Sequence, residues 1–179
     1  MKNFLAVLFF FVVNVLNVST VDAAQMVRIS DVNLGQYLST VRSAANSNEI
    51  RSVVKLEFSN PVRLEQNDRE SMQLKCWTST ISADSKKVGA IFFSVDNQNL
   101  VSALEIFIAD QENETRNVNL FSASLISIFA PLQLSESEFS AVISEIFSET
   151  DPVWCEKSQR YIVAQTTEEG ILTVIAMIE

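Results

Sequence analysis

Three neighbouring stretches carry the strongest fold signal in the sequence: QLKCWTSTIS at 73–82, GAIFFSV at 89–95 and VSALEIFIA at 101–109. In the third stretch, apolar Leu104 and Ile106 alternate with polar Glu105, which is the period of a strand with one apolar face. The first stretch alternates in the same way, whereas the second is apolar on both faces and belongs at the centre of a sheet. Short polar turns, DSKK and DNQN, separate the stretches. Such short connections predict antiparallel pairing of successive strands.

Helical patterns lie on both sides of this β-rich block. Residues 30–46 have apolar side chains at helical spacing, and Ser30 is the expected N-cap. A further short strand, residues 54–58, is expected to end before Pro61. After the block, residues 110–119 are polar and predict a connection, and residues 120–130 predict a helix that Pro131 ends.

A second helix after the block has the clearest local signal in the chain. Ser135 and Glu138 match a capping box, and Leu134 and Phe139 occupy the positions of a hydrophobic staple. An apolar stripe continues to residue 147. This pattern places Glu145 and Glu149 on the polar face of the helix.

The C-terminal segments 160–166 and 171–178 predict a hairpin, and the second of them is nearly all apolar, as in a central strand. The element order is then helix, about four strands, two helices and two strands. This order predicts an α+β fold: a single domain with an antiparallel sheet of about six strands, covered on one face by two or three helices.

The N-terminus is typical of a secretory signal peptide over residues 1–23. A short basic start precedes the apolar run FLAVLFFFVV at 4–13, and small residues favour cleavage between Ala23 and Ala24. An uncleaved anchor is the alternative, but Asn14 and Asn17 interrupt the run before the ~20 apolar residues that a spanning helix needs. We therefore expect an exported domain at 24–179, periplasmic or extracellular, with no membrane segment after cleavage.

Two cysteines, Cys76 and Cys155, remain in the mature chain. An even pair in an exported protein favours a disulfide, so one structural bridge between them is expected. Trp77 and Trp154 adjoin the two cysteines. Either they belong to the core beside the bridge, or they anchor an interface, where Trp is enriched.

Several chemistries lack the residues that they need. The chain has no His, so it has no Ser–His or Cys–His pair and no imidazole metal ligand, and its three Gly are far apart. We expect no catalytic residue, no cofactor and no metal. Carboxylate pairs remain as a remote alternative, and the candidate pairs and clusters are Glu136/Glu138, Glu145/Glu149/Asp151 and Glu168/Glu169. Asn113-Glu114-Thr115 matches the N-glycosylation pattern.

Charge narrows the choice of partners. The net charge is −9, and no Lys/Arg cluster offsets it, so nucleic acid is a poor partner whereas a basic protein is compatible. These features favour a non-enzymatic binding protein that acts on a protein partner, such as an inhibitor, immunity or accessory factor. The alternative is a small-molecule binder with an apolar cavity lined by Phe92, Phe107, Phe129 and Phe147. The sequence specifies neither the partner nor the oligomeric state.

Overall fold

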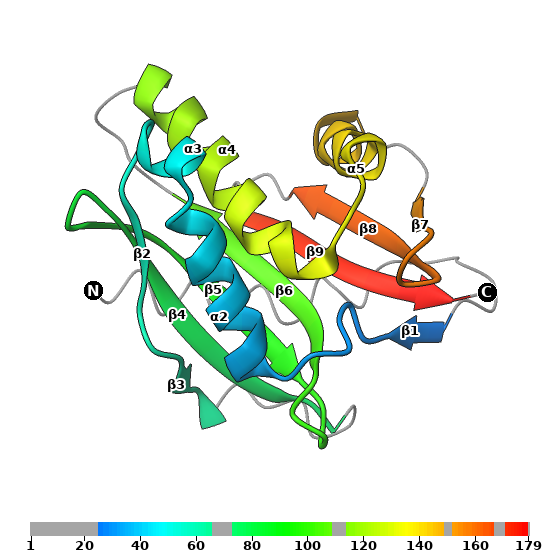
Figure 1. Cartoon of the computed structure of the whole chain (residues 1–179). Helices are drawn as coiled ribbons and strands as arrows, with labels where there is room; N and C mark the ends of the chain where they lie inside the picture. Colours follow the sequence, from blue (N-terminus) through cyan, green and yellow to red (C-terminus); the bar gives the residue numbers. More distant parts are fainter. Residues whose placement is uncertain (1–24, 66–72, 109–113, 149–151, 167–170, 179) are drawn as a thin grey trace.

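One antiparallel sheet of nine strands organises the chain (Figure 1). The computed structural model describes residues 25–65, 73–108, 114–148, 152–166 and 171–178. The strands are β1 (Gln25–Val27), β2 (Leu56–Phe58), β3 (Val62–Arg63), β4 (Lys75–Ala83), β5 (Lys86–Val95), β6 (Val101–Ile108), β7 (Val153–Cys155), β8 (Arg160–Thr166) and β9 (Ile171–Ile178).

The strand order across the sheet is β2-β4-β5-β6-β9-β8-β7, with β1 also paired to β9 and β3 to β4. Strand β9 lies between β6 and β8, so the apolar C-terminal segment is central, as its composition predicted. Phe93 of β5 is opposite Leu104 of β6, which is opposite Val174 of β9. This register places apolar residues from consecutive strands in one row on one face of the sheet.

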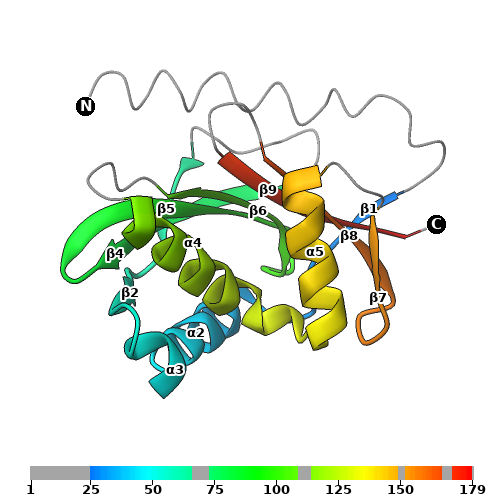
Figure 2. The ribbon, with the colours of Figure 1, turned by 90° about the horizontal axis from the view of Figure 1, so that it is seen from above.

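All the described helices lie on that same face (Figure 2). They are α2 (Leu34–Ala45), α3 (Asn48–Arg51), α4 (Glu114–Phe129), the 3₁₀ turn η4 (Ala130–Leu132) and α5 (Glu136–Ser148). Helices α2 and α4 pack together, and α5 packs over β7 and β8. We call the helix-covered side the inner face and the opposite side the outer face.

The core fills the space between the helices and the inner face. Tyr37 of α2 is fully buried and meets Phe93 edge-on, with ring centroids 5.9 Å apart. Its hydroxyl donates a 2.8 Å hydrogen bond to the backbone oxygen of Ile128 in the last turn of α4. The last four carbonyl groups of a helix have no intrahelical hydrogen-bond donor, and the Ile128 carbonyl is one of them. Tyr37 therefore joins α2 to α4 by a hydrogen bond as well as by apolar packing.

Two predicted helix boundaries are wrong. Helix α2 begins at Leu34 rather than after Ser30, because Asn33 and Gln36 form a capping box in which each side chain accepts from the other's backbone N–H. Helix α4 begins at Glu114, within the segment expected to be a connection. By contrast, the capping box of α5 is confirmed: the Ser135 N–H donates to Glu138, and the Glu138 N–H donates to the Ser135 hydroxyl.

The strand and helix numbers also need correction. The sheet has nine strands instead of about six, and four α-helices instead of two or three lie on it within the described residues. Strands β1, β3 and β7 are only two or three residues long, too short to show alternation in the sequence. The predicted signal peptide, residues 1–23, lies outside the described residues and stays a prediction.

The predicted disulfide is wrong. Cys76 on β4 and Cys155 on β7 form no bond. Four strands (β5, β6, β9 and β8) lie between β4 and β7, and five inter-strand spacings of ~4.8 Å put the two residues roughly 24 Å apart. A disulfide needs Cα atoms within about 7 Å of each other. The even number of cysteines, together with the predicted export, therefore gave the wrong expectation, because this reasoning takes no account of their positions in the sheet.

Candidate functional site

None of the described helices covers the outer face of the sheet (Figure 2). Its residues follow from the pairing registers, since directly opposed residues share a face. Its aromatic and larger apolar members are Val62, Phe92, Phe107, Trp154, Tyr161, Val163, Ile175 and Met177. Small and polar residues fill the spaces between them: Cys76, Thr78, Thr80, Ala90, Ser94, Ala103, Glu105, Gln165 and Thr173.

Burial is mixed on the outer face, where Val163 and Met177 are 8% exposed, and the contrast with the inner face is clearest on β5 and β6. On the inner face, Ile91, Phe93 and Leu104 are at most 1% exposed. On the outer face, Phe92 and Phe107 from the same two strands are only half-buried. The two faces of β5 have different neighbours, which accounts for the apolar sequence GAIFFSV. Side chains on one face contact the helices, and side chains on the other form part of the outer face.

A Trp–Tyr pair lies at the β7 end of this face. Trp154 is opposite Tyr161, and their ring centroids are 4.9 Å apart. Trp154 is 37% exposed, and Val62 at the opposite end of the face is 60% exposed. Trp and Tyr are enriched in protein interfaces because they combine a large apolar area with a polar group.

The two tryptophans lie on opposite faces. Trp77 points to the inner face, where it is half-buried and where the guanidinium of Arg63 lies 5.6 Å from its ring centroid. Trp154 points to the outer face. The expectation that both flank one disulfide does not hold, since Cys76 lies on the outer face and Cys155 on the inner face.

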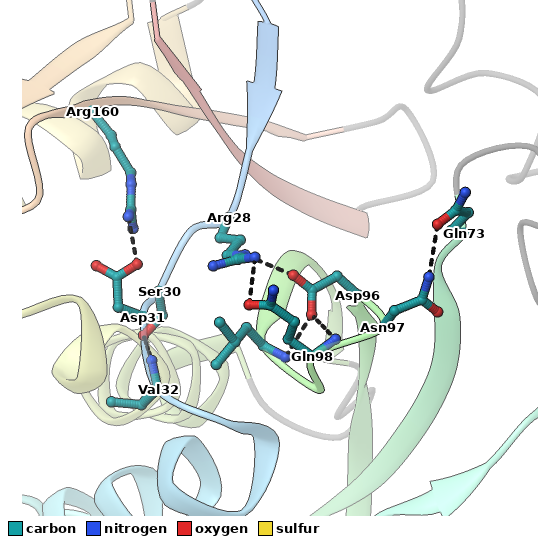
Figure 3. A network of polar contacts seen from close by, with 10 residues as sticks. Arg28, Ser30, Asp31, Val32, Gln73, Asp96, Asn97, Gln98 and Arg160 are labelled. Carbon is teal, nitrogen blue, oxygen red and sulfur yellow. Dashed lines mark hydrogen bonds and ion pairs between the residues drawn. The ribbon is translucent and has the colours of Figure 1, made fainter.

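A polar network fixes one end of the sheet (Figure 3). Arg28, which follows β1, donates to Asp96 at 2.6 Å and to Gln98 at 2.8 Å in the turn between β5 and β6. Asp96 also accepts from the backbone N–H groups of Gln98 and Leu100. Partial burial opposes ionisation of Asp96, but the hydrogen bonds from Leu100, Arg28 and Gln98 outweigh it and lower its pKa.

A second ion pair extends the network to β8, where Arg160 donates to Asp31 at 2.6 Å. Figure 3 shows these contacts together with a hydrogen bond that Asn97 donates to Gln73. The network therefore holds the segment between β1 and α2 against the sheet, and we assign it a structural role.

A buried carboxyl group lies on the other side of the sheet, in the seam between α5 and strands β7 and β8. Glu145 of α5 is only 3% exposed and accepts a 3.2 Å hydrogen bond from the backbone N–H of Ala164. Burial raises the pKa of Glu145 to about 7, although the hydrogen bond from Ala164 acts in the opposite direction. The sequence pattern had placed Glu145 on the polar face of the helix, and this is wrong.

Cys155 lies in the same seam. It is 1% exposed, and burial, together with the negative charges of Glu138 and Glu145, raises the pKa of its thiol to about 12. Such a thiol stays protonated at neutral pH and is a poor nucleophile. Glu138 anchors the start of α5, where its carboxylate accepts from the backbone N–H groups of Ser135 and Glu156.

The remaining candidate residues do not converge. Phe92 and Phe107 lie on the outer face, whereas Phe129 is buried on the helix side, so these three do not line one cavity. The side chain of Phe147 lies outside the described residues. So do Asn113 and the candidate carboxylates Glu149, Asp151, Glu168 and Glu169. Glu136 is exposed in the first turn of α5.

Comparison with known proteins gives no relative. No family model, no curated protein and no solved structure matches the chain. Within the described residues, no group of three or more Cys, Asp or Glu side chains is placed to hold a metal ion, and no helix has both the length and the apolar character to cross a membrane.

Proposed function

We propose that the protein is an exported, non-enzymatic binding protein that acts on a protein partner through the outer face of its sheet. The observation that carries the proposal is the apolar character of that face: Phe92, Phe107, Tyr161 and Ile175 are half-buried, and Trp154 and Val62 are exposed at its two ends. Apolar surfaces of this kind that remain accessible in a folded protein are typical of interaction sites.

Charge narrows the chemistry of the partner. The chain carries a net charge of −9, and Glu105 is the acidic residue on the middle strand of the outer face. Such a surface favours a partner whose apolar contact residues are surrounded by Lys or Arg, because complementary charge speeds encounter and disfavours other orientations. We therefore propose a basic protein partner in the periplasm or outside the cell.

The absence of His supports binding rather than catalysis, since it removes the commonest general base. The raised pKa of Glu145 is the feature that most favours an enzyme, because shifted pKa values are frequent in active sites. However, Glu145 is buried under α5 and bonded to the backbone of β8, which suits a structural role better.

The test is affinity capture with matched variants. The mature chain, prepared from the export fraction of its own host, is used to capture partners from that fraction, and bound proteins are identified by mass spectrometry. Two variants change the outer face, Trp154→Glu and Val62→Glu. Two controls change exposed apolar residues on the helix side, Val118→Glu and Ile126→Glu, which are 65% and 47% exposed against 60% for Val62 and 37% for Trp154.

We expect one basic partner that the wild type and both controls recover, and whose recovery falls at least about tenfold with Trp154→Glu, as for loss of an interface anchor. Its recovery should also fall with added salt. Equal recovery by the outer-face variants, or loss confined to the helix-side variants, would contradict the proposed surface.

A further inference from the structure

The seam between α5 and the β7–β8 edge contains an unusual combination of groups. Strand β7 pairs with only Arg160–Ile162 of β8, so the next outward backbone N–H, that of Ala164, lies beyond its end. The Glu145 carboxylate from α5 accepts a hydrogen bond from that N–H. A side chain of the helix thus takes the place of a neighbouring strand at the edge of the sheet.

The surroundings of Glu145 offer little compensation for a negative charge. Its helix neighbours Val142 and Ile146 are buried, and on β8 the Ala164 side chain is fully buried. The ionisable groups that face the seam are Glu138 on α5, the Cys155 thiol on β7 and Arg160 on β8, which is opposite Cys155 and has a buried Nη1 atom. Arg160, at the start of β8, is paired with Asp31, and no described cation contributes to the electrostatics of Glu145.

We propose that this seam is a pH-dependent latch: α5 is held tightly on the β7–β8 edge while the Glu145 carboxyl is protonated, and it loosens when that carboxyl ionises. An unpaired buried carboxylate is costly, and opening of the seam hydrates it. The latch is independent of the partner proposed above, because it lies on the other face of the sheet.

The sign and the pH window follow from linkage. The folded pKa of Glu145, about 7, is above its ordinary value of 4.5. The protonated Glu145 carboxyl therefore stabilises the closed seam fully below about pH 4.5. This stabilisation is lost as the pH rises to about 7, and the stability of the closed seam does not change further above that pH. Glu138, whose pKa is lowered by its hydrogen bonds, and Cys155, whose pKa is raised to about 12, do not titrate in this window.

Cys155 provides a built-in reporter, because it is 1% exposed beneath α5. In a Cys76→Ser background, the rate of Cys155 alkylation is measured at pH 5 and pH 8 and divided by the rate for the urea-unfolded protein at the same pH. This ratio removes the intrinsic pH dependence of the thiol. The test variant is Glu145→Gln, which is uncharged at both pH values, and the control is Glu136→Gln, which removes an exposed carboxylate from the same helix.

We expect the normalised rate to rise roughly 10- to 100-fold from pH 5 to pH 8 in the Cys76→Ser protein and in the Glu136→Gln control, as linkage for this pKa difference requires. The Glu145→Gln variant should show less than about a threefold change over the same pH range. The same rise in Glu145→Gln, or no rise in the parent protein, would overturn the latch.

A second measurement decides the matter if Glu145→Gln does not fold. The carboxyl carbon of Glu145 is followed by NMR in wild-type protein labelled with ¹³C at glutamate side chains, and the resonance is assigned with the Glu136→Gln variant and sequential connectivities. A titration midpoint between about 6 and 8 supports the latch, and a midpoint below about 5 overturns it.

Discussion

Cys76 and Cys155 point to opposite faces of one sheet, with four strands between them. No rotation of side chains can bring their sulfur atoms together, because the hydrogen-bonded strands between them fix their separation. The fold is therefore held by its core and its sheet, without a covalent link between these two positions.

The state of the cysteines gives the first prediction. Protein purified without reductant and unfolded in guanidinium chloride should react with two equivalents of a maleimide, as determined by intact mass. A reductant should leave the melting temperature unchanged. A protein that takes up maleimide only after reduction would contradict this arrangement of strands.

The second prediction concerns Gly89 on β5, where the backbone of β6 leaves no space for a side chain. A Cβ atom at this position would overlap the backbone oxygen of Phe107. Gly89→Ala should therefore lower the free energy of unfolding by about 2 kcal/mol or more, in the range of overpacked core positions. Urea unfolding followed by tryptophan fluorescence measures the change. Ala90→Gly, at the neighbouring position, is the control for general effects on the strand.

The third prediction distinguishes the predicted helix start from the observed one. Asn33 forms the capping box of α2, whereas the Ser30 hydroxyl accepts only a 3.4 Å bond from Val32. Asn33→Ala should lower the free energy of unfolding by about 1 kcal/mol, the usual effect of losing an N-cap. Ser30→Ala should lower the free energy of unfolding by less than half of that amount. The reverse ranking in thermal or urea unfolding would support a helix that begins near Ser30.

The fourth prediction concerns Glu138, which joins the first turn of α5 to the β7–β8 connection. Hydrogen bonds from the Ser135 and Glu156 backbone N–H groups lower the pKa of Glu138 below 4.5. Its stabilisation is thus present above about pH 4.5 and is lost as the pH falls through its folded pKa. Glu138→Gln should lower the free energy of unfolding by about 1 kcal/mol at pH 6. The variant should also lose less stability than the wild type as the pH falls below 4.5. A stability–pH curve parallel to that of the wild type would contradict this role.

The sequence predicted those parts of the fold that rest on long periodic patterns or on local capping chemistry. Strands β4, β5, β6, β8 and β9, the antiparallel pairing and the Ser135–Glu138 capping box all belong to this group. The α+β class follows from them. The short strands β1, β3 and β7 exist only because a longer neighbour provides hydrogen-bonding partners, so their own residues carry almost no signal.

The features of functional interest were harder to predict, because they depend on contacts between distant segments. Phe92 and Phe107 look like ordinary core residues in the sequence, and only the register places them on the outer face. Glu145 looks like a surface residue, yet it lies three positions after Val142 and shares the side of α5 that faces β8. That spacing is the signal that could have revealed its burial.

Site-specific photo-crosslinking in the intact host tests whether the protein binds a partner through its outer face. The photoreactive residue p-benzoylphenylalanine replaces Phe107 or Tyr161 on the outer face, or Ile126 on the helix side as the control. We predict that irradiation joins the outer-face positions to one basic protein and leaves the Ile126 position without that product. Crosslinking of that protein from Ile126 alone, or no product from either outer-face position in a folded, exported chain, would contradict binding through the outer face.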